Sequence, residues 1–179
     1  MINNQKYFLS TIFFSMIHEI GHILAIIKYG KKISEIKINA FSIDIEQNYS
    51  FNMSNKKELV ILLCGPLINL IFFAIFALFY KILNLNILKI FSIQNLIIGI
   101  LNLMPIYSLD GGQILFIFLR QKFNIYNANM ILFIISIIFI LPITTLGFLL
   151  AIRSSFNFSL LIFIFYLISL FLKKYFLSK

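Results

Sequence analysis

The chain has few ionisable residues for its length. Its 179 residues include six Asp or Glu, two His, one Cys and no Trp, and 61% of them are hydrophobic. A soluble globule cannot bury that proportion of apolar surface, so the scarcity of charge favours a membrane protein. The single cysteine, Cys64, excludes an internal disulfide, and a small thiol beside Gly65 is most often a packing residue.

Long apolar runs fill most of the chain. About 20 apolar residues in a helix cross a bilayer core. Runs that reach or approach this length predict five transmembrane helices, at roughly 7–28, 58–83, 90–104, 129–150 and 156–172. We therefore expect an all-α integral membrane protein.

Basic residues outnumber acidic ones, with 15 Lys or Arg and a net charge of +9. They are spread among short loops rather than gathered on one face, so we expect no nucleic-acid partner. If the five helices alternate in direction, eleven basic residues fall on one side and four on the other. The positive-inside rule then predicts a multi-pass protein of a bacterial cell membrane with its N-terminus outside and its C-terminus in the cytoplasm.

Two segments interrupt the helical pattern. Residues 33–53 alternate apolar and polar residues in IKIN and FSIDIE, which predicts a small β-hairpin or edge strand at the cytoplasmic side. In NLMPIYSLDGGQI, residues 102–114, Pro105 ends one helix, and the pair Gly111 and Gly112 marks a turn before a short helix to about Arg120. Irregular backbone at membrane depth needs protein or a water-filled cavity around it, which indicates a polar interior.

The stretch HEIGH, residues 18–22, places both histidines of the chain inside the first apolar run. Positions i and i+4 share a helix face, so His18 and His22 can bind one metal ion while Glu19 reaches a bound water. This is the HExxH pattern of zinc peptidases. The alternative is a coincidence of buried polar residues, each satisfied by a neighbouring helix. The cost of about 2.5 to 3.5 kcal/mol for a charged residue near the bilayer centre favours the metal.

A catalytic zinc usually has three protein ligands and one open position for water. Asp110 is the only carboxylate other than Glu19 in the apolar part of the chain. It could alternatively be the N-cap of a helix that starts at Gly111, but the incomplete zinc site favours the ligand role. The other four acidic residues fall in or beside the predicted cytoplasmic loop: Glu35, Asp44, Glu46 and Glu58.

Other polar residues in the apolar runs have two interpretations each. Thr11 and Ser15 share a helix face with the histidines, where their hydroxyls could lead water to a metal or bond back to the helix backbone. In CGPLIN, residues 64–69, Pro66 removes a helical hydrogen bond and Gly65 permits close helix approach. Asn69 by itself indicates an interhelical hydrogen bond.

Three motifs together carry a family resemblance: HEIGH at 18–22, GPLIN at 65–69 and NLMPIYSLDGG at 102–112. The chain resembles the site-2 proteases, which are intramembrane zinc metalloproteases, and in particular a sporulation subgroup that cleaves a membrane-tethered pro-sigma factor. The resemblance implies one Zn²⁺ per chain, held by His18, His22 and Asp110, with Glu19 as catalytic base. It also matches Asn69 and Asn102 with positions that assist the substrate or the oxyanion; the alternative for Asn102 is a cap or tie around Pro105.

The chain departs from this subgroup's pattern at several points. Members of the subgroup commonly have a further helix before the HExxH helix and a CBS domain after the last one, and we expect neither in residues 1–179. Ser108 also stands where the family often has a second proline. We expect residues 1–179 to form one intramembrane metalloprotease core domain without a CBS or PDZ domain.

The resemblance implies hydrolysis of a peptide bond in or near a transmembrane segment. The expected partners are the lipid bilayer, a membrane-associated protein substrate and regulatory membrane proteins. The rival hypothesis is a zinc-binding carrier or pseudoprotease, which needs the metal ligands but no base.

Overall fold

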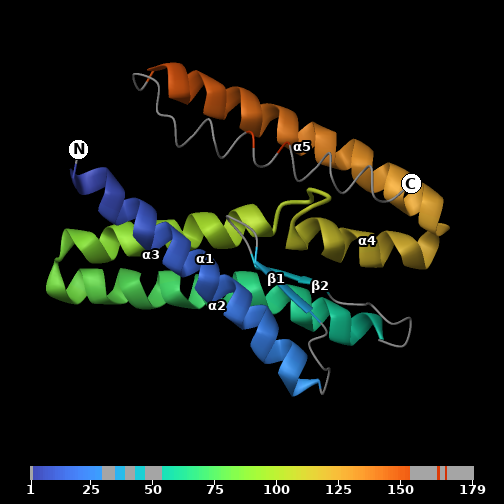
Figure 1. The fold of residues 1–179 in the computed structure, drawn as a ribbon, viewed down its shortest axis with the longest axis horizontal. Helices are drawn as coiled ribbons and strands as arrows, with labels where there is room; N and C mark the ends of the chain where they lie inside the picture. Colours follow the sequence, from blue (N-terminus) through green and yellow to red (C-terminus); the bar gives the residue numbers. More distant parts are fainter. Residues whose placement is uncertain are drawn as a thin grey trace. The chain divides into compact units, whose positions relative to one another are not determined.

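The computed structural model describes residues 2–29, 35–38, 43–46 and 54–153, together with positions 165 and 168. The chain divides into two compact units, residues 1–102 and 103–179. The elements described are helices α1 (Ile2–Lys28), α2 (Asn55–Leu83), α3 (Asn86–Asn102), α4 (Asp110–Lys122) and α5 (Ile125–Arg153), and strands β1 (Glu35–Ile38) and β2 (Ile43–Glu46) (Figure 1).

Three of the described helices are long and apolar enough to cross a membrane, through the segments Leu9–Lys28, Asn55–Leu83 and Ile125–Leu150. Helix α3 is also apolar, but its 17 residues span only about 26 Å at 1.5 Å per residue, less than the bilayer core of about 30 Å. The protein is thus a predominantly helical membrane protein. Five spans remain a prediction, and the fifth, 156–172, lies outside the described residues except for two positions.

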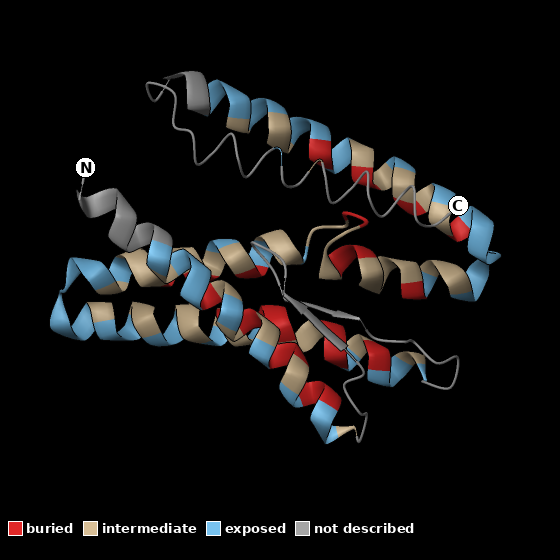
Figure 2. Cartoon of the chain, viewed as in Figure 1, coloured by how far each residue is buried: buried red, intermediate tan, exposed pale blue. Residues whose placement is uncertain are grey.

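The buried residues of α1 and α2 recur every three or four positions, as expected for helices that present one face to a core. Figure 2 shows the buried positions of α1 in its second half, where the helix crosses α2. In α1 they are Phe14, His18, Gly21, His22, Ala25 and Ile26, and in α2 they are Glu58, Ile61, Leu62, Gly65, Pro66 and Asn69. Both sets contain polar residues and glycine, so this core is not purely apolar.

Glycine allows α1 and α2 to approach closely. A Cβ added to Gly21 would lie 2.7 Å from the carbonyl oxygen of Cys64, closer than real side chains come. Small residues permit such backbone contact between membrane helices. The crossing therefore brings HEIGH directly against CGPLIN.

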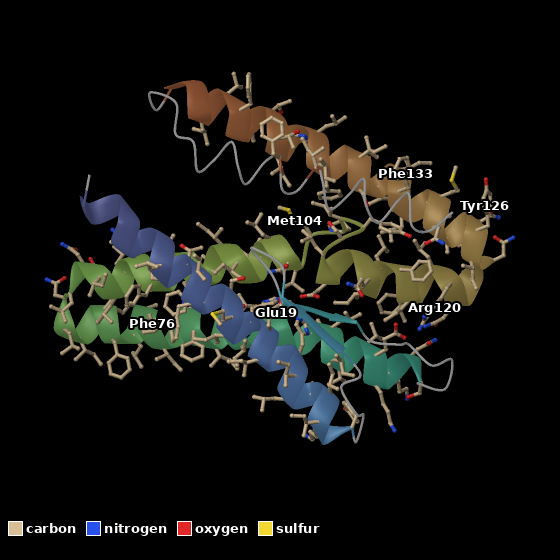
Figure 3. All side chains as sticks on the ribbon, in the orientation of Figure 1. Glu19, Phe76, Met104, Arg120, Tyr126 and Phe133 are labelled. Carbon is tan, nitrogen blue, oxygen red and sulfur yellow. The ribbon has the colours of Figure 1, made fainter. Side chains whose placement is uncertain are left out.

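An aromatic cluster connects the three helices of the first unit, α1, α2 and α3. The rings of Phe14, Phe76 and Phe91, one from each of α1, α2 and α3, have centroids 5.3 to 5.6 Å apart. All three pairs are edge-to-face, which is a favourable arrangement of ring quadrupoles. Phe76 is labelled on α2 in Figure 3.

The two strands pair antiparallel, with Glu35 opposite Glu46 and Ile38 opposite Ile43. They fall within the segment whose alternating pattern predicts strands. The remainder of 33–53 lies outside the described residues.

In the second unit, the turn that precedes α4 is fixed to α5 through Tyr107. The backbone N–H of Tyr107 donates to Ser136 Oγ at 2.8 Å, and its hydroxyl donates to Asn129 Oδ1 at 3.1 Å. The first turn of α4 packs tightly on this segment, because a Cβ on Gly111 or Gly112 would collide with the carbonyl oxygen of Leu103 or Ile106. The glycine pair is therefore a packing requirement, and the turn predicted at these two positions is wrong, because both residues lie in the first turn of α4.

Candidate metal centre

His18 and His22 form a buried pair on one face of α1, with 4% and 7% of their surfaces exposed. Their Nε2 atoms lie 3.2 Å apart. Each Nδ1 faces an oxygen: Asn69 Oδ1 at 2.7 Å for His18 and the Ile61 carbonyl at 2.8 Å for His22. Because a carbonyl oxygen only accepts, each Nδ1 donates its N–H, and in the neutral imidazole each Nε2 then carries a lone pair.

The geometry of this pair fits a zinc ion. With their Nε2 atoms 3.2 Å apart, two neutral imidazoles would direct lone pairs at each other, which is unfavourable unless a cation, either a proton or a metal, lies between them. Two nitrogen ligands at about 2.0 to 2.1 Å from a tetrahedral zinc are themselves about 3.3 Å apart. The imidazoles therefore stand at the separation that two ligands of one zinc adopt.

Gly65 makes room for both rings. A Cβ at this position would collide with His22 Nε2 and would lie 2.8 Å from His18 Nε2. The sequence predicts only a close helix approach here. In the structure, Gly21 of HEIGH and Gly65 of CGPLIN lie at the same helix crossing. The glycine in each motif is therefore a sequence feature that could have indicated that the two motifs face each other.

Asn69 is fully buried on α2, and its amide makes hydrogen bonds to groups of α1 and α3. Its oxygen accepts from His18, and its nitrogen donates to Phe14 O at 3.3 Å and to Asn95 Oδ1 at 3.0 Å. The direct contact of Asn69 is thus with a histidine, while its role toward substrate or oxyanion stays a prediction. Sequence reasoning did not identify Asn95, although a polar residue inside the apolar run 90–104 was a signal.

The hydroxyl of Thr11 bonds between helices. Gln94 on α3 donates its Nε2 hydrogen to Thr11 Oγ1 at 3.0 Å, and Ser10 Oγ donates to Gln94 Oε1 at 2.9 Å. Thr11 therefore helps to join α1 to α3.

Three further predicted site residues occupy defined positions. Glu19 is half-buried beside His18, in the part of α1 that crosses α2 (Figure 3). Asn102 is the last residue of α3, and its Nδ2 donates to the Ile98 carbonyl at 3.1 Å. Glu19 and Asn102 share the first unit with His18, His22 and Asn69, whereas Asp110 belongs to the second.

Asp110 is the first residue of α4, and Leu109 is the N-cap. The alternative that Asp110 caps a helix beginning at Gly111 is therefore wrong. A carboxylate in the first turn of a helix interacts favourably with the helix dipole, so Asp110 is stabilised as the first residue of α4. The side chain is half-buried.

Comparison with known proteins agrees with this chemistry. The model of peptidase family M50 matches residues 81–143. Stage IV sporulation protein FB of Bacillus subtilis is 27% identical over 131 residues, which cover 72% of this chain and 46% of that protein. A zinc metalloprotease of Methanocaldococcus jannaschii is 28% identical over 140 residues, covering 73% of this chain and 40% of that protein.

These matches show similarity to peptidase family M50 and to two of its metalloprotease relatives, and so support the resemblance to the site-2 proteases. The chain spans less than half the length of either relative. The similarity therefore extends over only part of each relative.

Proposed function

We propose that the chain is an intramembrane zinc metalloprotease that hydrolyses a peptide bond in or near a transmembrane segment. The observation that carries the proposal is the convergence of the two HExxH imidazoles, with Nε2 atoms 3.2 Å apart. Asp110 is the third ligand in this proposal. Two imidazole nitrogens and one carboxylate oxygen make a donor set of catalytic zinc sites, which keep a fourth position open.

The residues of the chain divide the chemistry between them. His18, His22 and Asp110 would hold a zinc ion, which would supply Lewis-acid chemistry toward the scissile carbonyl and toward water. Glu19, next to His18 in the sequence, takes the proton from the attacking water and delivers it to the leaving amine. A carrier or pseudoprotease has no use for such a base, so Glu19 separates the proposal from its rival.

The substrate is a membrane-associated protein. A transmembrane helix hides its peptide bonds in its own hydrogen bonds, so the segment must unwind before cleavage. We assign its capture to β1 and β2, because an extended segment can add to the open edge of a sheet. The similarity to a sporulation protein makes a pro-sigma factor one candidate substrate.

The proposed topology places the N-terminus outside and the C-terminus in the cytoplasm of a bacterial cell. It is supported by the unequal distribution of eleven and four basic residues. Reporter fusions at both termini test it, and a cytoplasmic N-terminus would contradict it.

The decisive experiment coexpresses the chain with candidate single-span membrane proteins and compares it with Glu19→Gln. We expect the variant to keep stoichiometric zinc, measured by mass spectrometry of the purified protein, and to lose cleavage. Glu58→Gln is the matched control, because Glu58 is a buried carboxylate in the first turn of α2, and it should cleave as the parent does. Full biological function of Glu19→Gln would favour the rival.

A further inference from the structure

A chain of amide hydrogen bonds leads from α3 to His18, and its direction can be determined. It begins at Asn95, which is fully buried and whose Nδ2 lies 2.9 Å from the Phe91 carbonyl. A carbonyl oxygen only accepts, so the amide nitrogen of Asn95 must point toward Phe91. The amide oxygen of Asn95 therefore points toward Asn69.

Asn69 continues the chain in the same direction. Its Nδ2 donates to Asn95 Oδ1 at 3.0 Å and to the Phe14 carbonyl at 3.3 Å. With both of these partners accepting, the amide oxygen of Asn69 is left facing His18 Nδ1, at 2.7 Å. Reversing either amide would place donor against donor and oxygen against oxygen in a fully buried site.

His22 reaches the same protonation pattern without a relay. Its Nδ1 donates to the Ile61 carbonyl at 2.8 Å, a backbone group that no side-chain substitution removes. The two imidazoles thus point their Nε2 lone pairs at one place by different means.

We propose that Asn95 is a positioning residue that sets the tautomer of His18 through Asn69, keeping the His18 Nε2 lone pair available for the metal. Without Asn95, only the longer bond to the Phe14 carbonyl, at 3.3 Å, opposes reversal of the Asn69 amide. A reversed Asn69 donates to His18 Nδ1, which moves the imidazole proton to Nε2 and blocks metal binding there. The metal role rests on the proposed function, whereas the tautomer belongs to the metal-free protein.

The test is nitrogen NMR of metal-free protein with ¹⁵N-labelled histidine, in detergent micelles. We expect both histidines of the parent chain to carry a proton at Nδ1, as their contacts with Asn69 Oδ1 and the Ile61 carbonyl require. In Asn95→Leu, His18 should show the Nε2-protonated form while His22 keeps the parent pattern, and zinc affinity should fall by about 10- to 100-fold, as for other outer-shell partners of zinc ligands. His22 is the internal control.

Two further variants separate the relay from general packing. Ser92→Ala removes another α3-to-α2 hydrogen bond, from Ser92 Oγ to the Phe73 carbonyl, and should leave both tautomers unchanged. Asn95→Asp in its protonated form can still donate to Phe91 and accept from Asn69, and should keep the parent pattern.

A His18 of the parent chain that lacks a proton at Nδ1 overturns the proposal without any variant. So does Asn95→Leu if its tautomers and zinc affinity equal those of Ser92→Ala. An uncleaved substrate with the expected tautomers contradicts only the proposed function, so the two failures are distinguishable.

Discussion

Helices α1 and α5 satisfy their polar side chains in different ways. In α5 the hydroxyls of Thr144 and Thr145 donate to carbonyls three or four residues earlier in the same helix. In α1 the polar groups bond across helices, as His18 does to Asn69 and Thr11 does to Gln94. A local bond forms in any isolated helix, whereas a bond between helices fixes their relative rotation and depth. The polar residues of α1, which bond between helices, therefore fix the positions of the side chains around His18.

Among the substitutions that test this difference between α1 and α5, we expect the largest effect at Gly65, where both imidazoles of α1 contact α2. In Gly65→Ala the new methyl group would displace His22 Nε2 and crowd His18 Nε2. We expect zinc affinity to fall by more than about 100-fold, beyond the usual effect of altering a partner of a ligand, and cleavage to be lost.

Gly99→Ala provides the matched control for Gly65→Ala. Its Cβ would lie 3.3 Å from Leu70 Cδ2 and from the Pro66 carbonyl, so neighbours need to move by only a few tenths of an ångström. Competition with a zinc chelator measures both variants. Equal affinity in the two would contradict the assigned role of Gly65.

Ser136 allows the two kinds of hydrogen bond to be compared within α5, because its hydroxyl makes one bond inside the helix and one to another segment. It donates to the Leu132 carbonyl in its own helix and accepts from the backbone N–H of Tyr107. Ser136→Ala leaves that buried N–H without its acceptor, which should destabilise the protein by about 1 to 3 kcal/mol. Thr144→Val removes only a local bond and should change stability by less than about 0.5 kcal/mol.

Unfolding of Ser136→Ala and Thr144→Val in detergent, followed by circular dichroism, compares the two directly. Similar losses in both would show that the link from Ser136 to Tyr107 contributes nothing beyond a local hydroxyl bond.

Proline in β2 tests whether backbone groups of the strands, rather than their side chains, hold the substrate. Neighbouring residues of a strand direct their N–H groups to opposite edges, so Asp44→Pro and Ile45→Pro each remove the donor from one edge. Cleavage should fall by up to about tenfold, the equivalent of one net hydrogen bond of about 1.4 kcal/mol. Zinc content should not change. Parent-like cleavage by both variants would exclude edge pairing.

The sequence could predict what depends on local pattern. Helical spacing placed His18 and His22 on one face, and the lengths of the apolar runs predicted α1, α2 and α5 because they reflect the thickness of the bilayer. The relay through Asn95 could not be predicted, since it depends on the rotation of α3 against α2. The start of α4 was placed too late, because Gly111 and Gly112 indicate a turn by their sequence, whereas both lie in the first turn of the helix, where they pack against backbone carbonyls.

Substitution of Ser108 should have the smallest effect on stability, because its hydroxyl, unlike that of Ser136, forms no hydrogen bond with the described residues. Its Oγ is buried and has no hydrogen-bond partner among the described residues. A hydroxyl that has lost water without gaining a partner destabilises a fold, so Ser108→Ala should leave stability unchanged or raise it by up to about 1 kcal/mol. The measurement is the same unfolding experiment as for Ser136→Ala. A clear loss of stability would mean that this hydroxyl bonds an ordered water, and Ser108 would then join the residues whose polar atoms are satisfied beyond their own segment.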